Sequence, residues 1–321
     1  MGKVKAGTTM AILRQPASKM QDHNGTRARH RIASGRTEGK VAVFTRLPGA
    51  LLRAAFVVLL IITPSILLPI EGADGSQFVV LVALAAAIFT LAEYTSDSPS
   101  LVEFRDAPPF NRLRFGALML TVFTLSIVFR QVENAGTVTM IFQEIGQRIG
   151  ASIDFPYSPV RLMLLTLPAD TTAAAMQQIR TAAGMSYLIS LCSLAIFVIL
   201  LRLRGWPRNA GAFNVWVNLP TFDPTAGGDV VDRLNRASQI NLILGFLLPF
   251  LVPAILKIVA IFAGPISLTD PQTLIWAVSA WAFLPASLLM RGVALSRVAQ
   301  MIYVQRKRAY AKAAADGLLP V

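Results

Sequence analysis

Six apolar runs of roughly membrane-spanning length follow one another along the chain. They cover residues 49–70, 77–91, 115–129, 185–201, 240–263 and 273–290. About twenty apolar residues in a helix cross the hydrocarbon core of a bilayer, and a helix pairs all of its own backbone groups there. No alternation of apolar and polar residues, the mark of a membrane β-barrel, replaces this pattern. The chain is therefore predicted to be an all-α integral membrane protein with about six transmembrane helices.

Positive charge is unevenly distributed between the connections of these runs. Four segments are basic, whereas the connections 71–76 and 264–272 contain no Lys or Arg; the basic segments are 1–47, 93–114, 202–239 and 291–312. Cytoplasmic segments of membrane proteins are enriched in these residues. With six spans all four basic segments fall on one side, so both termini are predicted to be cytoplasmic. The high Ala and Arg content is typical of GC-rich bacteria, so we expect a bacterial inner membrane.

Domain organisation follows from the same pattern. Residues 1–47 lack an apolar period and are predicted to be a disordered basic tail. Residues 48–293 form the six-helix membrane domain, with a cytoplasmic loop at 202–239, and residues 294–321 form a second basic cytoplasmic tail. The formal net charge of +13 is concentrated in the tails and beside the spans. This placement favours contact with anionic lipid over nucleic acid.

The connection between the third and fourth spans, residues 130–184, is too long for a simple loop. Residues 136–149 place apolar side chains at helical spacing between polar ones, which predicts an interfacial amphipathic helix; the apolar positions are Val138, Ile141, Phe142, Ile145 and Ile149. Residues 160–167 are apolar but too short to span, and a re-entrant segment is the alternative reading. Asp170 is the expected N-cap of a helix that continues into span four.

Span five carries the most distinctive stripe of residues. Asn241, Gly245, Pro249, Pro253 and Lys257 recur every four residues and share one helical face. The prolines free backbone carbonyls, and a lysine within a membrane is costly unless it is paired or hydrated. This face is a candidate functional polar face that lines a cavity or packs on a partner. The alternative is that the lysine extends its side chain to the interface.

Carboxylates gather in the segment that follows span two. Glu93, Asp97, Glu103 and Asp106 form a candidate acidic cluster. Paired carboxylates hold divalent cations or perform acid/base chemistry. The neighbouring arginines offer the alternative of simple ion pairs.

Other chemistry is restricted by composition. Cys192 is the only cysteine, and His23 and His30, the only histidines, lie in the basic tail. No nucleotide-binding, zinc-protease or hydrolase motif is present. We therefore expect no cofactor, no metal and no recognisable catalytic site. The sequence favours a membrane scaffold, assembly or interaction protein that binds other membrane proteins or itself; a small-solute transporter or channel, and a membrane-embedded enzyme acting on lipid, are the alternatives.

Overall fold

The computed structural model describes residues 46–68, 73–130, 136–207, 213–223, 225, 227–263 and 270–316. All regular secondary structure in these residues is helical, and six of the helices are long and apolar enough to cross a membrane. The predicted all-α, multi-pass membrane architecture is thereby confirmed. The predicted disordered tail, residues 1–47, lies almost entirely outside the described residues, as do both histidines.

Each of the six long helices begins before its apolar run, because turns outside the apolar stretch continue the helical hydrogen bonding. They are a first helix, Arg46–Leu67, followed by α2 (Ala73–Thr95), α3 (Phe110–Val128), α6 (Ala173–Leu203), α8 (Val230–Ala263) and α9 (Pro271–Ala315). Three shorter helices complete the order, namely α4 (Thr137–Ile153), α5 (Pro159–Leu164) and α7 (Val215–Asn218). The segment 294–321 was predicted to be a basic tail, but its residues 294–315 form the last part of α9.

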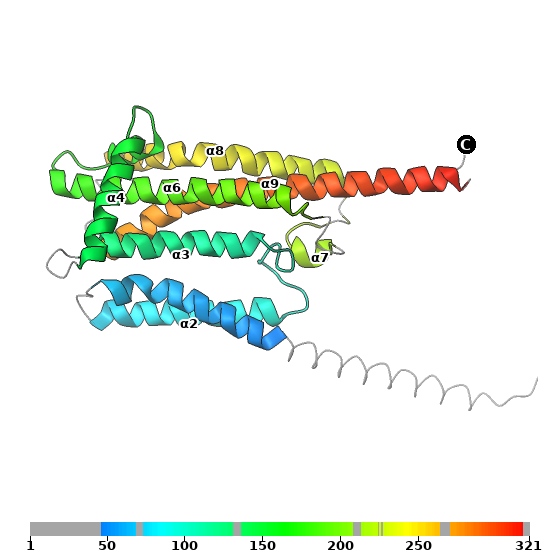
Figure 1. Cartoon of the computed structure of the whole chain (residues 1–321), viewed down its shortest axis with the longest axis horizontal. Helices are drawn as coiled ribbons and strands as arrows, with labels where there is room; N and C mark the ends of the chain where they lie inside the picture. Colours follow the sequence, from blue (N-terminus) through cyan, green and yellow to red (C-terminus); the bar gives the residue numbers. More distant parts are fainter. Residues whose placement is uncertain are drawn as a thin grey trace, which may run out of the picture.

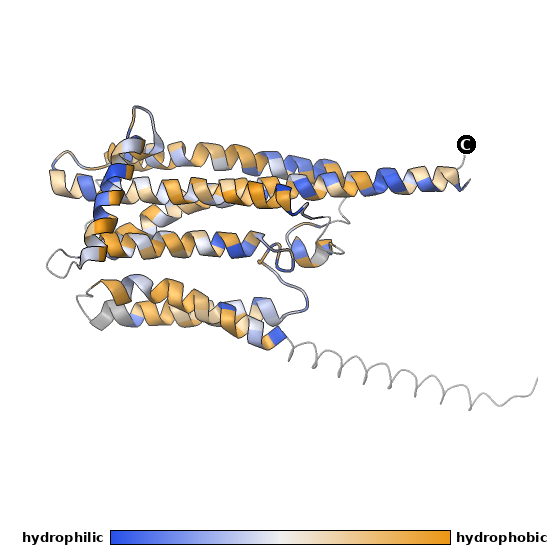
Figure 2. Ribbon diagram, viewed as in Figure 1, coloured by the Kyte–Doolittle hydropathy of each residue, from blue (hydrophilic) through white to orange (hydrophobic). Residues whose placement is uncertain are grey.

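Helices α3, α6, α8 and α9 form the main bundle, and the first helix and α2 lie beside it as a hairpin (Figure 1). The start of the first helix and the end of α9 lie at the same end of the bundle, together with α7. We call this the basic end. Helix α4 lies across the opposite end, and the last part of α9 projects past the basic end. Apolar residues dominate the long helices, whereas the projecting part of α9 is largely polar (Figure 2).

The buried core falls into two clusters. One lies toward α4 and joins α3, α6 and α9 through residues such as Val122, Ala182 and Val278. The other lies at the basic end and is rich in aromatic rings, with Phe104 at its centre. The Phe104 ring is 4.6 Å from that of Phe110 and 5.8 Å from that of Trp206, measured between centroids. The connections at the basic end therefore fold into a packed cap and are not merely solvated loops.

Helix α4 crosses α6 on a surface of glycines. A Cβ atom on Gly184 would lie 2.6 Å from the Cα atom of Gly150, and one on Gly150 would lie 2.8 Å from the Arg180 carbonyl. Glycine therefore lets the two backbones touch. On α4, Val138, Ile141 and Ile145 remain exposed. The amphipathic segment is thus a helix that packs by its glycine side and leaves an apolar stripe uncovered.

An ion cluster fixes the turn after α4. The Asp154 carboxylate is almost fully buried and lies 2.7 Å from the Arg161 Nε atom and 3.0 Å from the Arg180 Nε atom. It therefore ties α4, α5 and α6 together. The N-cap of α6 is Thr172, whose hydroxyl accepts a bond from the Ala175 N–H. The prediction of Asp170 as this cap is wrong, since the helix begins two residues later.

Residues 160–167 include all but the first residue of the short helix α5. Its Val160, Met163 and Leu164 side chains are buried in the core cluster near α4. A hydroxyl of Ser158 caps its start. Six residues rise only about 9 Å, so α5 is a buried turn of helix and does not cross the bundle.

Candidate functional site

Glu103 joins four separate parts of the chain at the basic end. Both of its carboxylate oxygens accept bonds from Arg291 of α9, at 2.6 and 2.7 Å. Thr221, after α7, donates to the same carboxylate at 2.8 Å. Arg291 also donates to the Asn241 side chain of α8 at 3.0 Å. A bidentate pair of this kind is geometrically specific, so it fixes the α2–α3 connection against α8 and α9.

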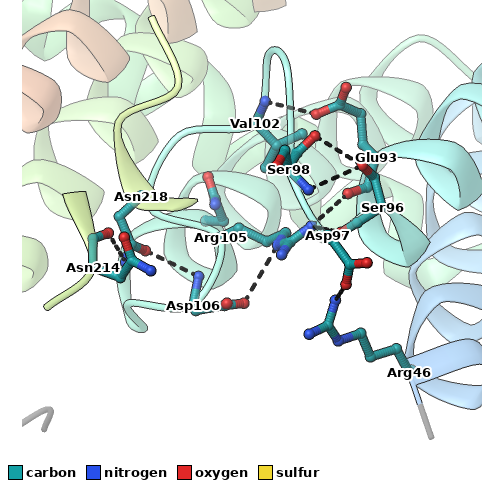
Figure 3. A network of polar contacts seen from close by, with 12 residues as sticks. Arg46, Glu93, Ser96, Asp97, Ser98, Val102, Arg105, Asp106, Asn214 and Asn218 are labelled. Carbon is teal, nitrogen blue, oxygen red and sulfur yellow. Dashed lines mark hydrogen bonds and ion pairs between the residues drawn. The ribbon is translucent and has the colours of Figure 1, made fainter. Parts of the chain in front are cut away.

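The rest of the α2–α3 connection is bound to α7. The Phe104 N–H donates to the Asn218 carbonyl at 2.7 Å, and the Asp106 N–H donates to the Asn218 side chain at 3.1 Å. Figure 3 shows Asn218 beside Asp106, with Arg105 reaching from this loop toward the end of α2. Arg105 donates to the carbonyls of Glu93 and Ser96 at 2.9 and 2.6 Å. These bonds hold the connection in one conformation.

The remaining carboxylates of the candidate acidic cluster have partners of their own. The Glu93 carboxylate accepts bonds from the Ser100 hydroxyl and from the N–H groups of residues 100–102. Asp97 pairs with Arg46 at 2.8 Å, and Asp106 lies 3.5 Å from Arg105. The four carboxylates therefore bind four different partners and do not share a site. Within the part of the chain that the structure describes, no three His, Cys, Asp or Glu residues are grouped to hold a metal.

The candidate polar face of span five divides into a buried part and an exposed part. Asn241, Pro249 and Pro253 are buried, whereas Lys257 is exposed. Gly245, on the same face, touches α9, because a Cβ atom there would lie 2.8 Å from the Pro285 carbonyl. The face is therefore mainly a packing surface for α9.

Pro253 frees the carbonyl of Pro249, because proline lacks the N–H that would bond to it. The buried indole N–H of Trp281, on α9, donates to this carbonyl at 3.2 Å. The prolines of span five predicted freed carbonyls, but span five itself did not indicate which group would donate to them. The Trp281 indole on the next apolar run is the sequence feature that could have indicated this donor.

An apolar groove lies between α8 and α9 toward the opposite end. Its volume is about 370 Å³, and its lining includes Met163 of α5, Thr166 and Leu167 just after that helix, and Ile179 of α6. One wall is α8, where lining residues recur every four positions at Leu248, Val252, Leu256 and Ala260. The first turns of α9 diverge from α8 in Figure 1. Three prolines, one of them in α9, interrupt the backbone bonding of these two helices and permit such divergence.

The lining of this groove is chemically uniform. Among its lining residues, Thr166 alone has a hydroxyl, and the Trp281 indole is already bonded. Ala277, Ala280 and Leu284 line the groove and are exposed at its rim. The groove therefore opens sideways, toward the surroundings of the bundle. It has the chemistry to hold apolar groups and none to perform acid/base catalysis.

Asp229 connects the start of α8 to the projecting part of α9. Its carboxylate accepts a bond from the Val231 N–H at 2.6 Å and pairs with Arg306 at 2.8 Å. The N–H bond, followed by the arginine, holds the pKa of Asp229 below its ordinary value. The side chain thus stays charged at neutral pH.

Comparisons with protein-family models, with curated proteins and with solved structures found no match for this chain.

Proposed function

We propose that the protein is a non-catalytic membrane interaction protein that receives a helix of a partner membrane protein in the α8–α9 groove. The observation that carries this proposal is the apolar, sideways-open lining of the groove. It runs from Leu248 to Ala260, about 18 Å along α8 at 1.5 Å per residue. A groove of this length matches several turns of an apolar helix.

Small residues at the rim favour a helix as the occupant. Ala260, Ala277 and Ala280 line the groove and leave space for a second backbone to approach closely. Membrane helices associate through such small residues, because lipid provides no hydrophobic driving force between them. Helix α8 also offers a large free face, since 17% of its apolar window is buried, against 56% of that of α9.

The geometry gives less support to the enzyme and to the transporter. The carboxylates of an enzyme acting on lipid would have to meet at one site, and Glu93, Asp97, Glu103 and Asp106 bind separate partners. A transporter built around Lys257 would need this side chain in a polar cavity. Lys257 is exposed instead and does not line the groove.

Photo-crosslinking in intact membranes tests the proposal. A photoreactive amino acid replaces Ala277 in the groove, and in a second variant it replaces Phe246, which is 66% exposed on another part of α8. We expect a protein adduct from position 277 that is absent from position 246. Filling the groove with Ala280→Trp should abolish the adduct, and Lys257→Met should leave it unchanged.

The other outcomes of this experiment are equally informative. An adduct at twice the mass of the chain identifies the partner as a second copy. Adducts with lipid alone at position 277, or equal protein adducts at both positions, overturn the proposal. Loss of the adduct in Lys257→Met would indicate that the partner binds the exposed part of α8 and not the groove.

We further propose that the basic end faces the cytoplasm of a bacterial inner membrane, with α4 at the outer interface. The distribution of Lys and Arg supports this orientation, and the exposed apolar stripe of α4 supports an interfacial position. A cysteine introduced at Ala315 in a Cys192→Ser background should resist a membrane-impermeant maleimide in intact cells. A cysteine at Asp170 should be labelled, and the reverse pattern would invert the topology.

A further inference from the structure

Arg114 lies near the basic end, and its guanidinium group stacks on aromatic rings and does not pair with a carboxylate. Its guanidinium carbon lies 4.9 Å from the centre of the Phe110 ring and 5.8 Å from that of the Phe283 ring. Its Nε atom is buried and has no hydrogen-bond partner among the described residues. A buried donor left without a partner is costly, so an acceptor is expected there.

The charges around Arg114 do not balance. Arg114 interacts electrostatically with both Glu103 and Arg291. Glu103 already accepts two bonds from Arg291 and one from Thr221. Two guanidinium groups thus lie near one carboxylate that bonds to only one of them, so the positive charge of Arg114 is left unbalanced. In a low-dielectric setting such a charge is stabilised by an anion.

Two further residues, on the first helix and α2, border the same region. Arg53 stacks on Tyr94, with its guanidinium carbon 4.6 Å from the ring centre, and Tyr94 also interacts electrostatically with Arg114. Arg105 is nearby but is occupied by the carbonyls of Glu93 and Ser96. The unbalanced charge therefore lies between the hairpin and the main bundle.

The depth of Arg114 matches that of lipid headgroups. It lies four residues into α3, about 6 Å from the start of the helix at the basic end. Tyr94 lies one residue before the end of α2. Arginine and tyrosine at the ends of apolar spans sit at the level where phosphate groups lie.

We propose that Arg114 binds the phosphodiester of a bilayer phospholipid, with Tyr94 and Arg53 beside the same headgroup. The phosphate oxygens accept from the guanidinium and neutralise its charge. The positive charges of Arg114 and Arg53 favour an anionic lipid over a zwitterionic one. Free phosphate shares this chemistry, so the test separates the two sources.

The test uses the full chain in a mild non-ionic detergent, with phosphatidylglycerol, phosphatidylcholine or inorganic phosphate added in turn. Native mass spectrometry counts bound lipid, and the melting temperature reports the stabilisation that it gives. We expect phosphatidylglycerol to bind the unaltered protein about tenfold more tightly than it binds Arg114→Gln. The matched control is Arg112→Gln, which removes the same charge from an exposed position on the same helix.

Melting with and without lipid separates binding from a structural role. Arg114→Gln also loses the stacking on Phe110 and Phe283, so each protein is compared with itself in lipid-free detergent. Added phosphatidylglycerol should raise the melting temperature of the unaltered protein and leave that of Arg114→Gln unchanged. An equal rise for both proteins assigns Arg114 a structural role and overturns the proposal. Equal lipid binding by the Arg112→Gln and Arg114→Gln variants also overturns it, as does equal protection by inorganic phosphate.

Discussion

The Trp281 indole N–H donates to the carbonyl of Pro249, the acceptor that Pro253 leaves free. The bond joins α9 to the bend-prone part of α8 at the base of the groove. A buried acceptor in an apolar setting needs such a donor, and a proline-containing membrane helix finds it on a neighbour. One side chain thus supports the kinked helix and helps to line the site.

Replacing Trp281 with phenylalanine keeps an aromatic ring but removes the donor. We expect a loss of about 1–3 kcal/mol, because the Pro249 carbonyl is then buried without a partner. Trp276→Phe, on the same helix but only partly buried, is the matched control. Melting temperatures in detergent measure both, and an equal effect of the two changes would show that the hydrogen bond contributes little.

Alanine at Gly184 should loosen the crossing of α4 and α6. The added Cβ would lie 2.6 Å from the Gly150 Cα atom, so the backbones must separate. The expected cost is about 1–3 kcal/mol, as in other over-packed contacts. Gly116→Ala is the control, since a Cβ at that helical position meets nothing within 4 Å. Proteolysis of the region around α4 should increase only in the Gly184 variant.

We expect the ion cluster at Asp154 to contribute more to stability than an exposed ion pair does. Asp154→Asn leaves Arg161 and Arg180 without their shared carboxylate, and we expect a loss of about 2–3 kcal/mol. This is below the range for fully buried pairs, because both arginines are partly exposed. Glu144→Gln breaks an exposed pair with Arg148 and should cost about 0.5 kcal/mol or less. Thermal melting of the two variants compares them directly.

The N-cap of α9 should make stability depend on pH. Asp270 accepts bonds from the Thr273 hydroxyl and N–H, both at 2.7 Å, and these bonds lower the pKa of Asp270 from its ordinary value of 3.8. Because the pKa of Asp270 is lower in the folded state, the cap contributes its full stability to the fold at pH values above the pKa of Asp270 in the unfolded chain. This contribution is lost as the pH falls through the pKa of Asp270 in the folded protein.

Asp270→Ala should therefore cost about 1 kcal/mol near pH 7 and progressively less in acid. Asp270→Asn keeps a capping oxygen and should remove mainly the pH dependence. Melting curves between about pH 7 and about pH 3 test both expectations. The same loss in Asp270→Ala at every pH would show that the charged carboxylate adds nothing to the cap.

The stability that the Glu103–Arg291 pair gives to the fold should depend on the geometry of the two hydrogen bonds as well as on charge. Arg291→Lys keeps the charge but replaces two parallel bonds with a point contact, and it removes the donor to Asn241. We expect a lower melting temperature and faster proteolysis at the α2–α3 connection. Arg297→Lys, six residues further along α9, should change neither quantity.

The sequence alone determined that this chain is helical and crosses a membrane several times. Length and hydropathy suffice for that conclusion, because a bilayer forces each apolar segment to satisfy its own backbone. The four-residue repeat from Asn241 to Pro253 also predicted that these residues share one face of α8, and they are buried together. Such a repeat is a local, periodic feature.

Only the tertiary structure decided what these features touch. Sequence placed Glu93, Asp97, Glu103 and Asp106 in one segment, but the fold turns each toward a different partner. The Arg291 partner of Glu103 is 188 residues away, and the donor to Pro249 lies on another helix. Long-range pairs of this kind depend on how helices pack, and several packings satisfy one hydropathy pattern. The groove exists for the same reason, since two proline-containing helices diverge only when the rest of the bundle supports them.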